Sequence, residues 1–298
     1  MAVQIRSIKR RIKSIKNTRK ITKAMELVAA SKMRKAVNAA LETRPFALEA
    51  WKTILQIGSV TDTQLHPLLR QHKEIKKVLL LLVTSDRGLA GGFNANVIRK
   101  TIEQIDSYGK DVQIDAVAIG RRGEKALHHA GKTIIASFTE ITNKPTYEEV
   151  LPIGRLVLHE FITGTYDKVV IAYTDFVSAI AQTPVIFDLL PLTQKDVLIP
   201  ESDLKTQKPN TKEYLFEPSP NEVLDRMLPQ LVETKVYQAI LESAASEHSA
   251  RMMAMRSASD SAGEMINELT FSYNQARQSA ITQEIAEISS GKAALEQA

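Results

Sequence analysis

The most regular hydrophobic pattern lies near the C-terminal end of the chain, in residues 219–290. Stepping by alternating fours and threes from Leu241 reaches twelve positions, of which ten are apolar. A heptad sustained this long predicts a coiled-coil helix. At about 1.5 Å per residue such a helix is roughly 100 Å long, so it must pair with another helix or cross a larger body. The seam comprises Leu241, Ala245, His248, Met252, Met255, Ser259, Ala262, Ile266, Leu269, Tyr273, Ala276 and Ala280.

A second heptad occupies the N-terminal end, where we expect a helix from about Val3 to Ile57, bent at Pro45. Ile21, Met25 and Val28 are on a face next to its seam. This phase shift leaves two interpretations open: a stutter with solvated charges, or a helix that changes partner there. The seam begins with isoleucines, becomes polar and ends in small residues: Ile5, Ile8, Ile12, Ile15, Arg19, Thr22, Glu26, Ala29, Met33, Ala36 and Ala40.

Between the two heptads the hydrophobic period changes. Short apolar runs alternate with helical patterns near 94–107, 121–130 and 146–163. This alternation predicts a mostly parallel α/β sheet, Rossmann-like, with right-handed crossovers. A stretch rich in Pro, Lys, Ser and Thr from Leu198 to Pro220 indicates a linker. The apolar runs expected to form strands are 78–83, 114–119, 133–138, 169–173 and 185–190.

These patterns predict an α/β fold with long helices. The N- and C-terminal helices are expected to form an antiparallel coiled coil, with a mostly parallel α/β domain inserted between them. Small residues on both seams, such as Ala29 and Ala262, allow the two backbones to approach closely. The predicted division is an N-terminal helix (1–57), a connection (58–75), the α/β domain (76–195), a linker (196–218) and a C-terminal helix (219–298).

Composition and charge narrow the possible functions. The chain has 298 residues and no cysteine, which excludes disulfides, thiolate metal sites and cysteine catalysis. Nine Lys/Arg and no acid stand between Met1 and Met25, so the net charge of +5 describes a local patch. A mitochondrial presequence has a similar composition. Because the heptad continues past Met25 without a small-residue cleavage site, we interpret the segment as mature helix.

Candidate chemistry is sparse. A glycine-rich turn, Thr84 to Asn94, follows the first expected strand, where α/β folds often hold phosphate. However, no Lys and Ser/Thr follow Gly92, and the dinucleotide-binding spacing is missing. His159-Glu160 resembles the start of a zinc-protease motif, but Thr163 stands where the second histidine belongs. We therefore predict a noncatalytic chain with no cofactor and no metal site.

The chain resembles the γ subunit of F-type ATP synthases in three segments: 6–33, 84–94 and 273–291. Residues 247–255 are also similar to that family. The resemblance implies a central rotor shaft, on which proton-driven rotation of a c-subunit ring makes the β subunits cycle through ATP synthesis. Implied partners are the α and β subunits (the α3β3 ring), ε and the c ring. The implied location is peripheral, on the cytoplasmic face of a bacterial inner or plasma membrane.

The resemblance also implies roles for particular residues. Seven polar or flexible side chains are expected to contact β: Lys23, Met25, Arg251, Arg277, Gln278, Thr282 and Glu284. Arg87, Gly88 and Gly91 are expected to be turn residues or contacts with the base of β. Ile281, Ile285 and Ile288, which shift the apolar stripe by one position, are expected to form an apolar bearing at the shaft tip. The expected seam of the coiled coil includes Ile12, Ile15, Met252, Met255, Ile266, Leu269 and Tyr273.

Two other classes of function remain open from the residues alone. One is a nucleotide-binding α/β protein that uses the glycine-rich turn. The other is a nucleic-acid-binding protein that uses the basic first helix. Against the second, residues 1–44 contain no aromatic side chain on which a base could stack.

Overall fold

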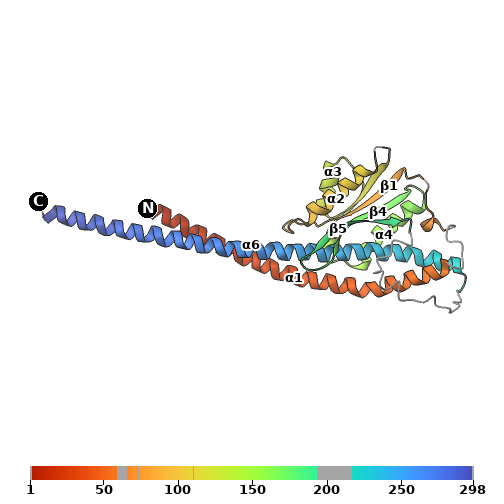
Figure 1. Cartoon of the computed structure of the whole chain (residues 1–298), viewed down its shortest axis with the longest axis horizontal. Coiled ribbons are helices and arrows are strands. Elements are labelled where there is room, and N and C mark those ends of the chain that lie inside the picture. Colours follow the sequence, from red (N-terminus) through yellow and green to blue (C-terminus); the bar gives the residue numbers. More distant parts are fainter. Residues whose placement is uncertain (1, 59–65, 73, 110, 193–216, 297–298) are drawn as a thin grey trace. The chain divides into compact units, whose positions relative to one another are not determined.

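The computed structural model describes residues 2–58, 66–72, 74–109, 111–192 and 217–296 (Figure 1). By its internal contacts the chain divides into two compact units. Unit 1 consists of Met1–Ala29 and Arg251–Ala298, and unit 2 of Ala30–Ala250. Both units contain parts of the same two long helices, and each unit is described by itself. Most of the predicted linker and part of the 58–75 connection lie outside the described residues, so the five-part division stays a prediction.

Long helices are present at both ends, as the heptads predicted. Helix α1 spans Ala2–Gly58, and Pro45 lies inside it. Helix α6 spans Pro220–Glu296. Within unit 2 the two helices run in opposite directions, because Ala36 packs with Ala244 and Ala245 whereas Thr43 bonds to Gln238. The contacts of Ala36 with Ala244 and Ala245 are between small side chains, which allows close helix packing.

Unit 2 contains a five-stranded sheet in the order β3-β2-β1-β4-β5. The first four strands in this order are parallel, and β5 is antiparallel to β4. The prediction of a mostly parallel sheet is therefore confirmed. The strands are β1 (Lys77–Val83), β2 (Gln113–Ile119), β3 (Thr133–Phe138), β4 (Lys168–Phe176) and β5 (Gln182–Leu190).

Helices cover both faces of the sheet (Figure 1). On one face, α2 (Phe93–Ser107) and α3 (Arg121–His129) pack on Val78, Leu80 and Leu82 of β1. On the other, α4 (Tyr147–Ile162) and the first part of α6 pack on Leu79, Leu81 and Val83. Because both faces are covered, β1 is a continuous apolar run and not an alternating one. The described residues of the unit also form two 3-10 turns, η2 (Pro67–Leu69) and η3 (Ile141–Asn143).

One stretch of α6 in unit 2 is buried on all sides. From Leu241 to Ser249 every residue is buried, including His248 and several serines. Ser246 Oγ donates to the carbonyl of Thr174 at 3.1 Å, and Ser249 Oγ donates to the carbonyl of Ala179 at 2.6 Å. Short hydroxyl side chains therefore connect this helix to the end of β4 and to the β4–β5 connection, where a larger side chain would hold them apart.

In unit 1 the buried side chains of α6 recur at the heptad spacing. Met255, Ser259, Ala262 and Ile266 are buried. On α1 the apolar side chains of Ile21 and Val28 are 60% and 56% exposed. The seam therefore continues through polar positions at this point, while the apolar residues on the neighbouring face point to solvent. The remaining expected seam positions, Ile12, Ile15, Met252, Leu269 and Tyr273, are half-buried.

Candidate partner-binding surface of the coiled coil

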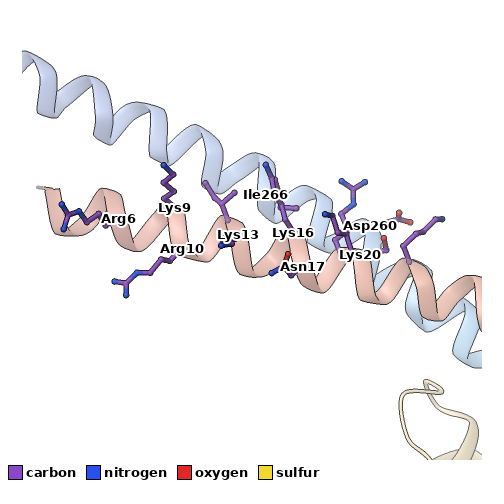
Figure 2. A pocket seen from close by; sticks show the side chains of 13 residues that line it. Arg6, Lys9, Arg10, Lys13, Lys16, Asn17, Lys20, Asp260 and Ile266 are labelled. Carbon is purple, nitrogen blue, oxygen red and sulfur yellow. The ribbon is translucent and has the colours of Figure 1, made fainter.

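A basic groove runs between α1 and α6 in unit 1 (Figure 2). Its volume is about 1290 Å³, and eight of its thirteen lining residues are Lys or Arg. Asp260 is the one acidic residue among them. Ile12, Ser259 and Ile266, which are seam positions, also line it. The basic lining residues are Arg6, Lys9, Arg10, Lys13, Lys16, Arg19, Lys20 and Lys23.

The spacing of the lysines places these charges on one face of α1. Lys9, Lys13, Lys16, Lys20 and Lys23 follow one another at spacings of four and three, so they lie along one stripe of α1 beside its seam. All five are exposed. Like charges at these spacings repel one another, and the stripe therefore gains by meeting a negatively charged surface.

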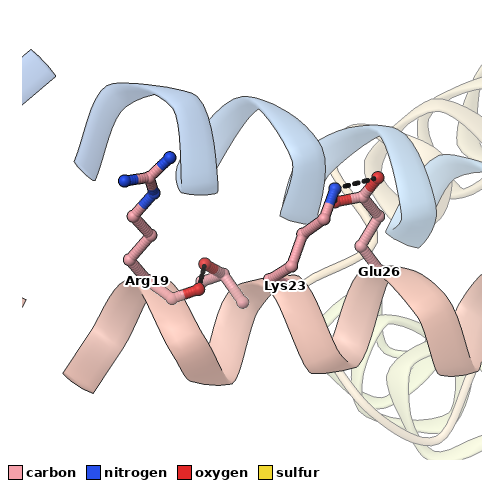
Figure 3. A network of polar contacts seen from close by, with 4 residues as sticks. Arg19, Lys23 and Glu26 are labelled. Atoms are coloured by element: carbon pink, nitrogen blue, oxygen red, sulfur yellow. Dashed lines mark hydrogen bonds and ion pairs between the residues drawn. The ribbon is translucent and has the colours of Figure 1, made fainter. Parts of the chain in front are cut away.

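Lys23, an expected β contact, already has a partner on its own helix. Its Nζ lies 3.0 Å from Oε2 and 3.2 Å from Oε1 of Glu26 (Figure 3). The Lys23 side chain is 57% exposed and that of Glu26 only 13%. An exposed pair at this spacing contributes about 0.3–0.5 kcal/mol, so a stronger carboxylate partner can displace Glu26.

The other expected β contacts fall into two groups. Arg277, Gln278, Thr282 and Glu284 are all exposed on the C-terminal part of α6. By contrast, Met25 and Arg251 are half-buried, and Arg251 also interacts with other residues of the chain. The side chains of the first group are accessible to a partner, whereas those of the second are accessible only in part. The expected tip residues Ile281, Ile285 and Ile288 are 48%, 62% and 74% exposed.

The glycine-rich turn is held by its own side chains. Asp86 accepts two backbone N–H bonds, from Arg121 at 3.2 Å and from Glu140 at 2.9 Å. Ser85 Oγ donates to the carbonyl of Arg87 at 2.6 Å, and Gly91 adopts a positive φ of 55°. Gly88 lies against Arg122, since a Cβ there would be 2.8 Å from its Nη2. These contacts hold the turn in one conformation, and a role of Arg87, Gly88 and Gly91 in contacting β stays a prediction.

The turn leads into α2, whose first N–H, that of Phe93, donates to the Ala90 carbonyl. The turn also packs against the start of α3, where no N–H group is left for a phosphate. A helix leaves its first four N–H groups without helical partners, and phosphates bind there. In α3 the N–H groups of Arg121, Arg122 and Gly123 donate to Asp86 Oδ1, the Ser85 carbonyl and Thr84 Oγ1. The N–H of Glu124 donates to the Gly120 carbonyl. Asp86 in addition places a negative charge where a phosphate would need to lie.

The described ranges contain no group of three or more His, Cys, Asp or Glu side chains able to hold a metal ion. Within those ranges, no helix is both long and apolar enough to cross a bilayer.

The basic cluster is visible in the sequence, but the groove is not. Asp260 and Ile266 line it from a segment of the chain more than 230 positions away from Lys16 and Lys20. The cluster is indicated in the sequence by nine Lys or Arg residues and no acidic residue within residues 1–25. The walls of the groove follow only from the register of the two helices.

Comparison with known proteins gives consistent matches along the whole chain. The family model described as ATP synthase matches residues 4–295. The ATP synthase gamma chain of Dehalococcoides mccartyi (strain CBDB1) is 44% identical over 293 residues, covering 98% of this chain and 99% of that one. The gamma chain of Heliobacterium modesticaldum (strain ATCC 51547 / Ice1) is 43% identical, with coverage of 98% and 99%.

Solved structures show the same architecture. The chain resembles one in the central stalk and c-ring structure of the mitochondrial ATP synthase of Tetrahymena thermophila, with a TM-score of 0.60 and 26% identity. That match covers 80% of this chain and 99% of the other. A chain of the Euglena gracilis mitochondrial ATP synthase matches with a TM-score of 0.67 at 18% identity, over 99% and 95% of the two chains, and supports the fold.

Proposed function

The chain belongs to the ATP synthase gamma-chain family, and on that premise we propose that the basic groove of unit 1 is the surface that meets acidic loops of the β subunits. Within this family the chain is the central rotor shaft and is noncatalytic, since the catalytic sites lie on β. The observation that carries the proposal is the charge of the groove: eight basic side chains against one acidic one.

The exposure of these side chains suits a moving contact. A shaft must leave each β subunit as readily as it meets it, so many weak contacts serve better than one tight bond. Exposed lysines interact with carboxylates by about 1 kcal/mol or less each, and salt screens them over about 10 Å. The stripe from Lys9 to Lys23 provides such contacts in a row.

A second set of contacts is proposed on the C-terminal part of α6. Arg277 has a planar guanidinium that can bond two oxygens of one carboxylate, with Gln278 beside it as a further donor. Thr282 and Glu284 follow within the next two turns. Ile281, Ile285 and Ile288, exposed on the same helix, would form the apolar bearing at the tip. Lys23, Met25 and Arg251 complete the proposed β contacts.

We further propose that the partners comprise the α and β subunits, the ε subunit and the ring of c subunits. The base of β would contact the turn that holds Arg87, Gly88 and Gly91. The assembly would hold this chain peripherally on the cytoplasmic face of a bacterial membrane, where proton flow through the c ring drives it.

The test is torque measured on the assembled complex. The chain is combined with its α and β subunits, and ATP-driven rotation is followed under a viscous load. Lys13→Glu together with Lys16→Glu should lower the torque while the complex still assembles, because two attractive contacts become repulsive. Lys125→Glu with Lys144→Glu, two exposed residues of unit 2, matches the charge change as a control. Equal torque in the two double variants would contradict the proposal.

The alternative functions have their own tests. A nucleic-acid-binding protein would bind DNA with an affinity that falls steeply with salt. A nucleotide-binding protein that uses the glycine-rich turn would bind ATP as an isolated chain, which calorimetry of the purified chain with ATP measures. The rotor function predicts that the purified chain hydrolyses no ATP and copurifies with α and β.

A further inference from the structure

A second, smaller groove lies in unit 2, between α1, α4 and α6. Its volume is about 590 Å³, within the range of roughly 300–1,000 Å³ typical of small-molecule sites. Glu42 comes from α1, Tyr147 and Arg155 from α4, and Glu233 and Tyr237 from α6. The rotor contacts proposed above use none of these residues.

Two tyrosine rings form a corner in this groove. The rings of Tyr147 and Tyr237 are 5.6 Å apart between centroids and nearly perpendicular, at 84°. A T-shaped pair leaves a right-angled corner bounded by a face of each ring. Ring faces carry the negative part of the aromatic quadrupole, which attracts cations.

The carboxylates beside this corner reinforce its negative potential. Glu233 Oε2 accepts a hydrogen bond from the Tyr147 hydroxyl at 3.1 Å, and its side chain is only 13% exposed. Arg155 is its nearest cation, but Nε lies 3.9 Å from Oε1 and the Arg155 side chain is 73% exposed. Glu42 has no hydrogen-bond or ion-pair partner in the ranges that the structure describes. Burial raises the pKa of Tyr147, and the charge of Glu233 raises it further. Burial and the charge of Glu42 likewise raise the pKa of Tyr237.

Elsewhere unit 2 fills such ring faces with its own lysines. Lys235 Nζ lies 4.8 Å from the centroid of the Phe187 ring, and Lys168 Nζ lies 5.9 Å from that of Tyr108. For Tyr147 and Tyr237 no such lysine is present among the described residues. The corner therefore combines two ring faces, one carboxylate without a cation and one with a loosely held cation.

We propose that this groove binds a small organic polycation of the alkylammonium class, with an ammonium group in the Tyr147–Tyr237 corner and another beside Glu42. Methylene groups between the ammonium groups would lie along the ring faces and Leu151, which also lines the groove. The ligand would compete with Arg155 for the carboxylate of Glu233. A simple metal ion lacks the apolar part that the rings select.

The test is calorimetric titration of the full chain with spermidine at low ionic strength, with Mg²⁺ as a probe of charge alone. We expect saturable one-to-one binding of spermidine and none of comparable strength for Mg²⁺. The net charge of +5 suppresses nonspecific uptake of a polycation, so saturation is informative.

Four variants test whether spermidine binds in this groove. Tyr237→Leu should weaken binding about tenfold and Glu42→Gln by a smaller factor, in line with cation–π and surface charge contributions. Arg155→Gln should tighten binding, because it removes the competing cation. Glu264→Gln changes an exposed carboxylate of unit 1 on the same helix and should have no effect. Glu42 is exposed, so its variant tests the site even where Tyr237→Leu misfolds.

Two results would overturn the proposal. One is the absence of saturable spermidine binding to the full chain. The other is binding that Glu42→Gln and Arg155→Gln leave unchanged, as in the Glu264→Gln control. Neither result affects the rotor function, which is tested by torque on the assembled complex.

Discussion

The guanidinium of Arg19 on α1 lies against Gly263 on α6. A Cβ built on Gly263 would be 3.4 Å from Cζ of Arg19 and 3.6 Å from its Nη2. Arg19 occupies a position that the heptad assigns to the seam, yet the residue is exposed and its side chain extends towards α6 (Figure 3). A charge at the seam is thus accommodated without burial, because the residue opposite it has no side chain. Such a pairing of a polar residue with a small one favours one helix register over its neighbours.

Replacing Gly263 with alanine should stabilise unit 1. The new Cβ would make an ordinary van der Waals contact with Arg19, and alanine is favoured over glycine in helices by about 1 kcal/mol. We expect Gly263→Ala to raise the free energy of unfolding, measured by urea denaturation followed by circular dichroism. Gly263→Leu should be less stable than the alanine variant, because its side chain needs the space of the guanidinium. A lower stability for Gly263→Ala than for the wild type would show that Arg19 cannot move.

Neighbouring positions on α6 provide a matched test of the seam. Ile266 is 9% exposed and Met265 is 49% exposed. Ile266→Asp buries an unpaired carboxylate and should cost about 3 kcal/mol, whereas Met265→Asp should change the stability by about 0.5 kcal/mol or less. Leu269→Asp should fall between them, since Leu269 is half-buried. Chemical denaturation of the three variants measures the order, and equal losses for residues 265 and 266 would refute the assigned seam.

The architecture of unit 2 was predictable because its strands are buried on both faces. Such strands appear as short continuous apolar runs, and the predicted runs 78–83 and 114–119 fall inside β1 and β2. The direction of β5 was not specified by its composition. The connection between β4 and β5 spans only residues 177–181, and a connection this short permits only an antiparallel pair. The short length of this connection can be read from the sequence only when the ends of both strands are known.

The two grooves were not predictable in the same way. The lysines of α1 are visible as a cluster in the sequence, but Asp260 joins them only through the pairing of two helices. In unit 2, Glu42, Tyr147 and Glu233 come from three separate elements, and no one of them alone indicates a groove in the sequence. A groove between helices depends on register and rotation about the helix axes. The heptad period constrains these two quantities but leaves the identity of facing residues undetermined.

Gly120 should be one of the least replaceable residues of the α/β fold. Its φ is +94°, and an added Cβ would lie 2.2 Å from the carbonyl oxygen of Thr84. Gly120→Ala should therefore cost about 3 kcal/mol or more, since both the backbone conformation and the contact are unfavourable. Gly131→Ala is the control: its φ is +65°, but a Cβ there meets no atom within 4 Å. The loss at Gly131 should be about 1 kcal/mol. Thermal unfolding distinguishes the two, and similar losses would contradict the steric argument.

His66 should make the stability of unit 2 sensitive to mild acid. Its Nδ1 accepts the N–H of Leu68 at 3.1 Å, and its Nε2 lies 3.2 Å from Oδ1 of Asp225. Burial lowers the pKa of His66 below its ordinary value of 6.5, although Asp225 opposes the shift. The unfolded chain therefore binds the proton more readily than the folded one. The stabilising contribution is present above about pH 6.5 and is lost as the pH falls through that value to the lower folded pKa.

The variant His66→Asn isolates this effect, because an asparagine oxygen can still accept the N–H of Leu68 but does not titrate. Urea unfolding at pH 7.5 and 5.5 should show a smaller loss of stability in the variant than in the wild type. Histidines elsewhere, such as the exposed His128 and His129, contribute equally to both proteins and cancel in the comparison. A steeper loss in the variant would mean that the pair with Asp225 outweighs burial, and that His66 is favoured in its charged form.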